Sequence, residues 1–132
     1  MLVVDASVLF EVVADTAQAE PTRALMAKDD ELAAPHLVDA EVLSVIQTQH
    51  RRGRLDDSAA AQAVADLQSW PAQRWSHRPL LERAWQLRDN VRGYDALYVA
   101  LAERLDATLL TSDARLTRAT GPRCEIVVLD AT

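Results

Sequence analysis

The chain has 132 residues, of which 49% are hydrophobic and 26% are charged. This length and balance predict one soluble globular domain over residues 1–132 and exclude a disordered chain. No stretch is apolar enough for a membrane span, and no basic residues precede the first apolar run, so we expect neither a membrane partner nor a signal peptide. Cys124 is the single cysteine and cannot form an internal disulfide, which favours a cytoplasmic setting.

Short apolar runs alternate with helical patterns along the whole chain. In chain order, the sequence predicts a strand at 2–5, helices at 6–14 and 20–28, a strand at 31–34, helices at 37–52 and 56–69, a strand at 73–76, helices at 79–88 and 95–105, a strand at 107–111, a helix at 114–119 and a strand at 125–129. Gly53 follows the helix at 37–52, where helices often end. This alternation predicts an α/β fold, with a mostly parallel sheet covered by helices on both faces.

Four carboxylates stand where apolar residues would be expected, namely Asp5, Glu41, Asp95 and Asp113. Asp5 and Asp113 both fall at the C-terminal end of a predicted strand, so they lie at the same edge of a parallel sheet, where ligands bind in this fold class. Glu41 shares a largely apolar helix face, and Asp95 begins the most apolar helix. Taken singly, each acid has a structural alternative as a helix cap, a dipole partner or half of an ion pair. Four such coincidences at four element junctions are much harder to accept.

The charge of these acids must be offset if they lie together. Two carboxylates about 4 Å apart repel by roughly 4 kcal/mol at an effective dielectric constant near 20. Protonation or a cation relieves this repulsion. Oxygen donors without histidine or thiolate favour Mg²⁺ or Mn²⁺, and neither the three histidines nor Cys124 show a zinc-site spacing.

The net charge of −6 argues at first against a nucleic-acid partner, because phosphates bind to basic surfaces. Thirteen of the fourteen basic residues are arginine, however, and arginine suits phosphate contacts. We take Arg51, Arg52 and Arg115 as candidate contacts to an RNA backbone. For any one of these arginines, a solvated helix end is the simpler explanation.

Four short motifs occur in order along the chain: Asp5 to Val8, Ala40 to Ser44, Tyr94 to Ala102 and Leu110 to Leu116. Together they resemble the PIN domain, and in particular the VapC toxins of type II toxin–antitoxin pairs. The resemblance implies a three-layer α/β/α sandwich and an endoribonuclease that depends on Mg²⁺ or Mn²⁺.

The resemblance also implies roles for individual residues. Asp5, Glu41, Asp95 and Asp113 match the catalytic, metal-binding quartet of the family, and Ser7, Thr111 and Ser112 match its supporting hydroxyl groups. Arg115 stands where a further acid would follow Asp113, which leaves the number of ions open. The family further implies a VapB-like antitoxin as partner, and a homodimer or a higher assembly with the antitoxin.

Three alternatives remain beside the toxin. The first is an RNA-processing nuclease of the same fold without a toxin role, and the second is a catalytically silent module that binds RNA or protein. The third, a phosphoaspartyl enzyme, normally needs a lysine near the acids. The single lysine, Lys28, falls in a predicted surface helix, which disfavours this third alternative.

Overall fold

The computed structural model describes residues 1–29 and 31–129. Within them, the strands are β1 (Leu2–Val4), β2 (Leu32–Pro35), β3 (Gln73–Trp75), β4 (Thr108–Thr111) and β5 (Ile126–Val128). These strands form one five-stranded sheet in the order β3-β2-β1-β4-β5, and every pairing between neighbours is parallel. The prediction of a central parallel sheet is therefore confirmed.

The helices are α1 (Ala6–Val13), α2 (Ala19–Met26), α3 (Leu37–Arg51), α4 (Asp57–Ser69), α5 (Leu81–Gln86), α6 (Gly93–Arg104) and α7 (Arg115–Arg118), with a 3₁₀ turn at Arg78–Leu80. Two predicted helices differ in detail. The segment predicted as one helix at 79–88 is a 3₁₀ turn followed by the short α5. Helix α6 begins at Gly93, which places Asp95 inside its first turn.

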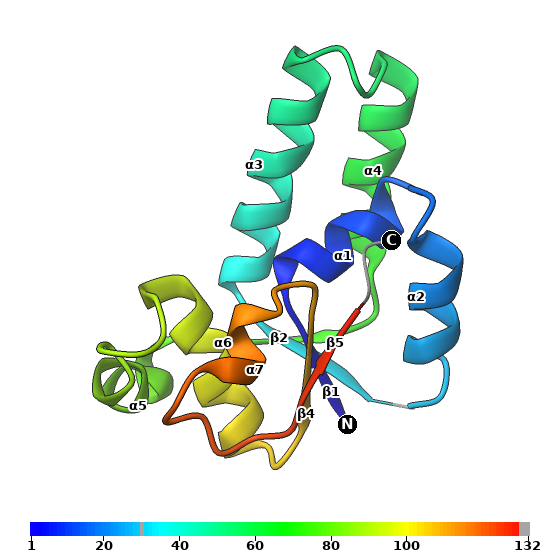
Figure 1. Cartoon of the computed structure of the whole chain (residues 1–132). Coiled ribbons are helices and arrows are strands. Elements are labelled where there is room, and N and C mark those ends of the chain that lie inside the picture. The colour runs from blue at the N-terminus through cyan, green and yellow to red at the C-terminus, as the bar shows by residue number, and fades with distance from the viewer. Residues whose placement is uncertain (30, 130–132) are drawn as a thin grey trace.

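Helices cover both faces of the sheet. The chain moves from β1 through β2 to β3 in one direction, and then from β4 to β5 on the other side of β1. Because crossovers between parallel strands are right-handed, α1 to α4 belong to one face and α5 to α7 to the other. Figure 1 shows the sheet between these groups, and the three-layer arrangement is confirmed.

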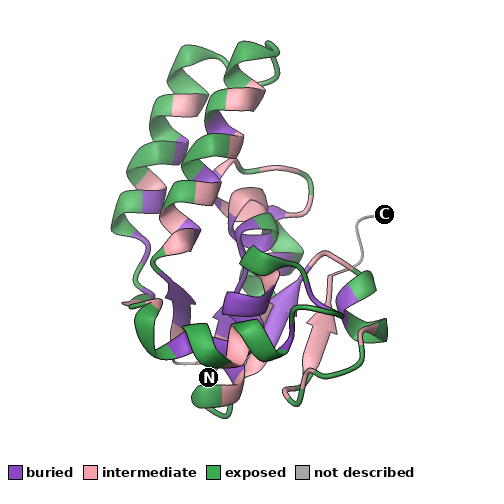
Figure 2. Cartoon of the chain, turned by 90° about the vertical axis from the view of Figure 1, so that its left-hand side faces the viewer, coloured by how far each residue is buried: buried purple, intermediate pink, exposed green. Residues whose placement is uncertain are grey.

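The core lies along the middle of the sheet and beneath α6. Val3 and Val4 of β1 are fully buried, and seven consecutive residues of α6, from Ala96 to Ala102, are buried as well. This helix packs against β1, β2 and β4, which explains its unbroken apolar run. Figure 2 shows the buried residues concentrated in the sheet region, whereas the outer faces of the long helices are exposed.

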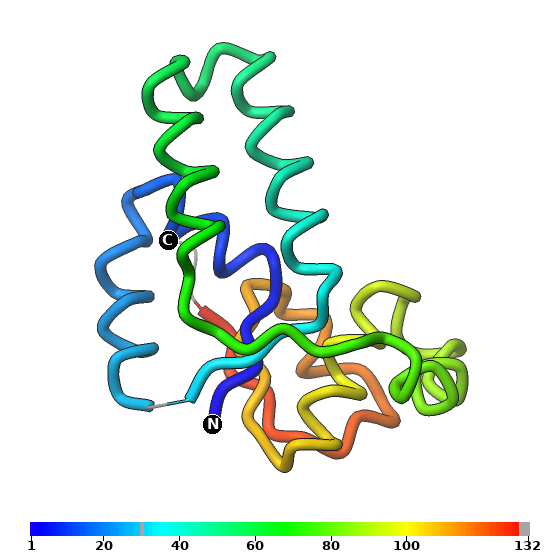
Figure 3. The backbone as a smooth tube through the Cα atoms, turned by 180° about the vertical axis from the view of Figure 1, so that it is seen from behind, coloured from blue at the N-terminus to red at the C-terminus, as the bar shows by residue number. Residues whose placement is uncertain are grey.

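Helices α3 and α4 form a long hairpin that stands out from the carboxyl edge of the sheet (Figures 1 and 3). At its base, the backbone N–H of Leu37 donates to Nε2 of His77 at 2.9 Å. At its tip, Gly53 has a φ of 74°, which glycine adopts without strain, so the predicted helix end is confirmed. None of the helices in the described part of the chain is long and apolar enough to cross a membrane.

Candidate active site

The topology directs the four predicted acids to one edge of the sheet. Asp5 directly follows β1, and Asp113 follows β4, the strand beside β1 where the strand order reverses. Glu41 lies in the second turn of α3, just after the chain leaves β2 at the same edge. Helix α6 leads back to the start of β4, so its N-terminal turn, with Asp95, also lies at the carboxyl edge. Open α/β sheets bind their ligands in the crevice at this edge, where the strand order reverses.

Asp5 is the most deeply buried of the four, with 6% of its surface exposed. It caps α1 and accepts hydrogen bonds from the backbone N–H of Val8 at 3.2 Å and from Oγ of Ser7 at 2.6 Å. The hydroxyl of Thr111 donates to its other carboxylate oxygen. Burial raises the pKa of Asp5, and these hydrogen bonds oppose part of that rise. The carboxylate is therefore held firmly in an environment that disfavours its charge.

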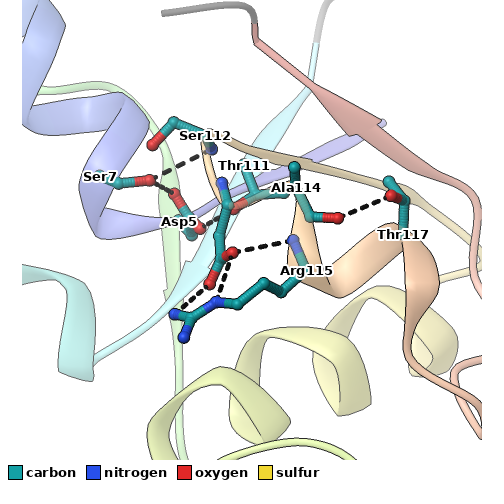
Figure 4. A network of polar contacts seen from close by, with 8 residues as sticks. Asp5, Ser7, Thr111, Ser112, Ala114, Arg115 and Thr117 are labelled. Atoms are coloured by element: carbon teal, nitrogen blue, oxygen red, sulfur yellow. Dashed lines mark hydrogen bonds and ion pairs between the residues drawn. The ribbon is translucent and has the colours of Figure 1, made fainter.

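The predicted hydroxyl residues connect α1 to the end of β4. Figure 4 shows Ser7 and Thr111 on either side of Asp5, with Ser112 above Ser7. The backbone N–H of Ser112 donates to Oγ of Ser7 at 3.3 Å, and that of Asp113 donates to Oγ1 of Thr111 at 3.1 Å. Ser7 and Thr111 thus orient Asp5 through their side chains, whereas Ser112 takes part through its backbone.

Glu41 is held by a residue that the sequence analysis missed. The hydroxyl of Tyr98, a residue that is only 2% exposed, donates to Oε1 of Glu41 at 2.7 Å. Burial raises the pKa of Glu41, the Tyr98 hydrogen bond lowers it, and the negative charges of Asp95 and Asp5 raise it further. Tyr98 is three residues after Asp95, so helical spacing placed it on the acidic face of α6. That spacing was the signal in the sequence that could have identified Tyr98.

Asp95 connects the charges of the cluster. Burial raises its pKa, and the negative charges of Asp5 and Asp113 raise it further, while Arg115 and Arg92 partly oppose this rise. Each of these effects requires the groups to be near one another. The structure therefore brings all four predicted acids into one electrostatic neighbourhood with an excess of negative charge.

Asp113 differs from the other three acids because it already has a cation. The guanidinium of Arg115 donates from Nε to Oδ1 at 3.0 Å and from Nη2 to Oδ2 at 2.9 Å. The backbone N–H of Arg115 also donates to Oδ1, at 2.9 Å. This hydrogen-bonded cation holds the pKa of Asp113 below its usual value. Asp113 is thus the neutralised member of the cluster.

The arginines predicted to contact RNA divide into two groups. Arg115 lies among the acids, but Arg51 and Arg52 lie at the tip of the hairpin. Arg51 is ten residues beyond Glu41 on the same helix, or about 15 Å along its axis. Two further arginines are nearer, because their charges act on the acids: Arg92 on Asp95 and Arg118 on Asp113. Arg118 follows Arg115 by three residues, so the sequence did indicate it, whereas Arg92 carried no distinctive spacing.

The donor set suits a hard divalent cation, because it consists of carboxylates whose mutual repulsion a cation would relieve. Among residues 1–29 and 31–129, however, no three or more His, Cys, Asp or Glu side chains are arranged so that they could hold an ion. The contact with Arg115 already occupies both carboxylate oxygens of Asp113. The residues fit Mg²⁺ or Mn²⁺ in chemistry, and binding requires their side chains to draw together.

Comparison with known proteins now identifies the family. A family model described as the PIN domain matches residues 2–122. The chain belongs to the PIN domain family. It is 43% identical to ribonuclease VapC1 of Mycobacterium tuberculosis over 126 residues, which is 94% of each chain. The predicted resemblance to VapC proteins is thus confirmed.

Two solved structures have the same fold at low sequence identity. VapBC2 from Rickettsia felis, in a crystal structure bound to a DNA fragment from the promoter, aligns with a TM-score of 0.70 at 14% identity, over 98% of each chain. A toxin–antitoxin complex from Klebsiella pneumoniae aligns with a TM-score of 0.66 at 18% identity, over 97% of each chain. Both confirm the α/β fold of this PIN domain.

Proposed function

We propose that this PIN domain is a Mg²⁺- or Mn²⁺-dependent endoribonuclease that acts as the toxin of a type II toxin–antitoxin pair. The observation that carries the proposal is the acidic cluster at the switch point of the sheet, where burial raises the pKa values of Asp5, Glu41 and Asp95 and like charge adds to the rise at Glu41 and Asp95. Membership of the PIN family and 43% identity to a protein named as a ribonuclease support the same activity.

Asp5, Glu41, Asp95 and Asp113 would hold the cation. The bound ion supplies positive charge that offsets the charge developing on the phosphate oxygens during hydrolysis. Ser7 and Thr111 keep the Asp5 carboxylate in one orientation by donating to its two oxygens.

Glu41 is suited to accept a proton from the attacking water, because a raised pKa brings a carboxylate closer to neutral pH. Tyr98 fixes the rotamer of Glu41 and leaves its other oxygen available. The protein thus provides both the base and its orientation.

RNA is the proposed substrate, and single-stranded or looped RNA fits best. Its phosphates can enter a recessed acidic crevice that a stiff duplex reaches less readily. The cations next to the crevice, Arg92, Arg115 and Arg118, are placed to hold backbone phosphates around the cut. Arg51 and Arg52, at the hairpin tip, are suited only to a distant part of a long substrate.

A VapB-like antitoxin is the proposed partner, and a homodimer the proposed assembly. The fold shared with a Klebsiella pneumoniae toxin–antitoxin complex supports the antitoxin. Exposed Leu43 of α3 and Val64 of α4 line a pocket between these helices and supply apolar surface for a protein contact. On the same helix α4, Ala63 and Leu67 are buried in the core, while Val64 is exposed.

The test is RNA cleavage by the purified chain in Mg²⁺ or Mn²⁺, and growth after expression without an antitoxin. We expect cleavage that EDTA stops, together with growth arrest that a co-expressed VapB-like protein reverses. EDTA-resistant cleavage would contradict metal dependence. Cleavage without growth arrest would instead support an RNA-processing nuclease, and RNA binding without cleavage would support a silent module.

A further inference from the structure

A pocket of about 500 Å³ opens next to the acidic cluster, between the start of α1, the first half of α3 and the start of α6. Its lining includes Ser7, Leu37, Glu41, Ser44, Val45 and Tyr94. Ser7 and Glu41 also belong to the candidate active site, so the pocket is continuous with it. A strand of RNA with its scissile phosphate at the acids would have a neighbouring nucleotide within reach of this pocket.

Tyr94 is the unusual residue in this lining. It precedes Asp95 in the first turn of α6, yet 65% of its surface is exposed. An aromatic ring left in water forgoes the stabilisation that burial would bring. A core role therefore does not explain Tyr94, whereas an exposed ring beside a nuclease site offers a stacking platform, because every nucleobase has a π face.

The charge of the pocket favours a nucleobase, and not a phosphate group, as its occupant. Its lining contains one carboxylate and two serine hydroxyls, and neither lysine nor arginine is part of it. A phosphate would meet repulsion from Glu41, while the arginines that suit phosphates act on Asp95 and Asp113. The apolar side chains of Leu37 and Val45 suit a neutral planar group, and hydroxyls can donate to or accept from its polar edge.

We propose that this pocket receives a nucleobase next to the scissile phosphate, with Tyr94 stacked on the base and Ser44 facing its polar edge. This inference rests on the proposed ribonuclease activity and adds a subsite to it. The pocket would then set which nucleotide is accepted beside the cut. Cleavage preference at that nucleotide becomes a property of α3 and of the first turn of α6.

The experiment measures equilibrium binding of a fluorescent single-stranded RNA, chosen because the wild-type chain cleaves it, in EDTA so that it stays intact. We expect Tyr94→Ala to bind about tenfold more weakly, since base–aromatic stacking contributes on the order of tenfold or more. Tyr94→Phe, which keeps the ring, should bind like the wild type. Trp85→Ala is the matched control, because Trp85 is an aromatic residue that is 67% exposed on α5 and does not line the pocket.

A second arm replaces the nucleotide on each side of the cut, in turn, with an abasic one. At the position that occupies the pocket, the abasic RNA should bind the wild type weakly and should no longer distinguish it from Tyr94→Ala. If Tyr94→Ala weakens binding equally for intact and for both abasic RNAs, the ring does not act by stacking and the inference is overturned.

The remaining outcomes separate the two proposals. A wild-type chain that neither binds nor cleaves RNA overturns the ribonuclease proposal, and the subsite with it. A wild-type chain that cleaves RNA, with Tyr94→Ala binding equally well, overturns the subsite alone. Unchanged RNA binding combined with weakened binding of a VapB-like protein would assign the pocket to the protein partner.

Discussion

Two half-buried polar clusters begin two residues apart on α3 and differ in their charge balance. In the first, Asp39 accepts hydrogen bonds from Nε and Nη2 of Arg74, at distances from 2.9 to 3.3 Å. The same guanidinium donates to the carbonyl oxygens of Leu67, Trp70 and Ala72. This cluster pairs its charges and fastens the end of α4 to α3 at the base of the hairpin.

In the second cluster, the neutral hydroxyl of Tyr98 is the one hydrogen-bond partner of Glu41 among the described residues. Glu41 also faces the like charges of Asp95 and Asp5. The comparison teaches that burial of polar groups does not by itself mark a functional site. In a structural network the charges are paired with one another, as those of Asp39 and Arg74 are. A binding site instead keeps an excess of charge that its ligand neutralises. Variants of each cluster should therefore affect different properties.

The largest effect should come from Asp5→Asn. The substitution removes one charge and keeps a good helix cap, because asparagine can still accept from Val8. We expect the rate of RNA cleavage to fall by roughly a hundredfold or more, since the variant loses a carboxylate that would both bind the ion and fix its position. Mg²⁺ should raise the unfolding temperature of the wild type but not of the variant, by linkage of binding to folding.

The exposed carboxylate of Asp57 at the hairpin tip provides the control for that experiment. Asp57→Asn should keep both cleavage and stabilisation by Mg²⁺. An Asp5→Asn variant as active as the wild type would remove the acidic cluster from the mechanism.

Arg74→Ala should show the opposite pattern. It leaves Asp39 without its cation and three carbonyl oxygens without their donor. We expect the free energy of unfolding to fall by about 2 kcal/mol, below the full cost of breaking a buried pair because Asp39 is partly exposed. Cleavage per folded molecule should not change, as urea unfolding and activity assays on the same sample can show.

Arg54→Ala is the control, because Arg54 is exposed near the hairpin tip. It should leave both stability and activity close to those of the wild type. A loss of activity in Arg74→Ala larger than its loss of folded protein would mean that the first cluster also serves the site.

Tyr98→Phe tests the second cluster more finely, because it removes only the hydroxyl that orients Glu41. We expect about tenfold weaker Mn²⁺ binding, the usual size of losing a group that positions a metal ligand. Titration of Mn²⁺ by electron paramagnetic resonance measures this without RNA. Tyr94→Phe, which removes a hydroxyl from the first turn of the same helix, should bind Mn²⁺ like the wild type. Equal Mn²⁺ affinities for Tyr98→Phe and the wild type would show that Glu41 needs no such support.

The smallest effect should be the pH dependence of stability without metal. Asp5, Asp95 and Glu41 have pKa values raised above their ordinary 3.8, 3.8 and 4.5. The native state binds the protons of these three carboxyl groups more tightly than the unfolded state does. The groups therefore stabilise the fold at pH values below their ordinary pKa values, and this stabilisation is lost as the pH rises through the raised pKa values. Asp113 has a lowered pKa, so its contribution to stability changes only below pH 3.8, its ordinary pKa.

The unfolding temperature in EDTA should therefore decrease from about pH 4.5 towards neutral pH, the window opened by these raised pKa values. Asp5→Asn should show a smaller decrease, and saturating Mg²⁺ should reverse the decrease in the wild type. A metal-free protein that becomes steadily more stable across this range would contradict the charge excess in the second cluster.

Much of the fold was predictable because it depends on local patterns. Short apolar runs predicted every strand near its observed position, and the seven apolar residues after Asp95 predicted a buried helix. The division of the segment at 79–88 was missed, because a helical pattern does not distinguish a 3₁₀ turn from the first turn of an α-helix.

The sequence alone determined the fold class and the candidate acids, because buried strands and carboxylates at strand ends are both properties of neighbouring residues. Only the tertiary structure decided which groups meet. It joined Tyr98 to Glu41 across 57 positions and Arg74 to Asp39 across 35. Such contacts depend on how crossovers place one helix against another, and the spacing of residues along the chain does not record that placement.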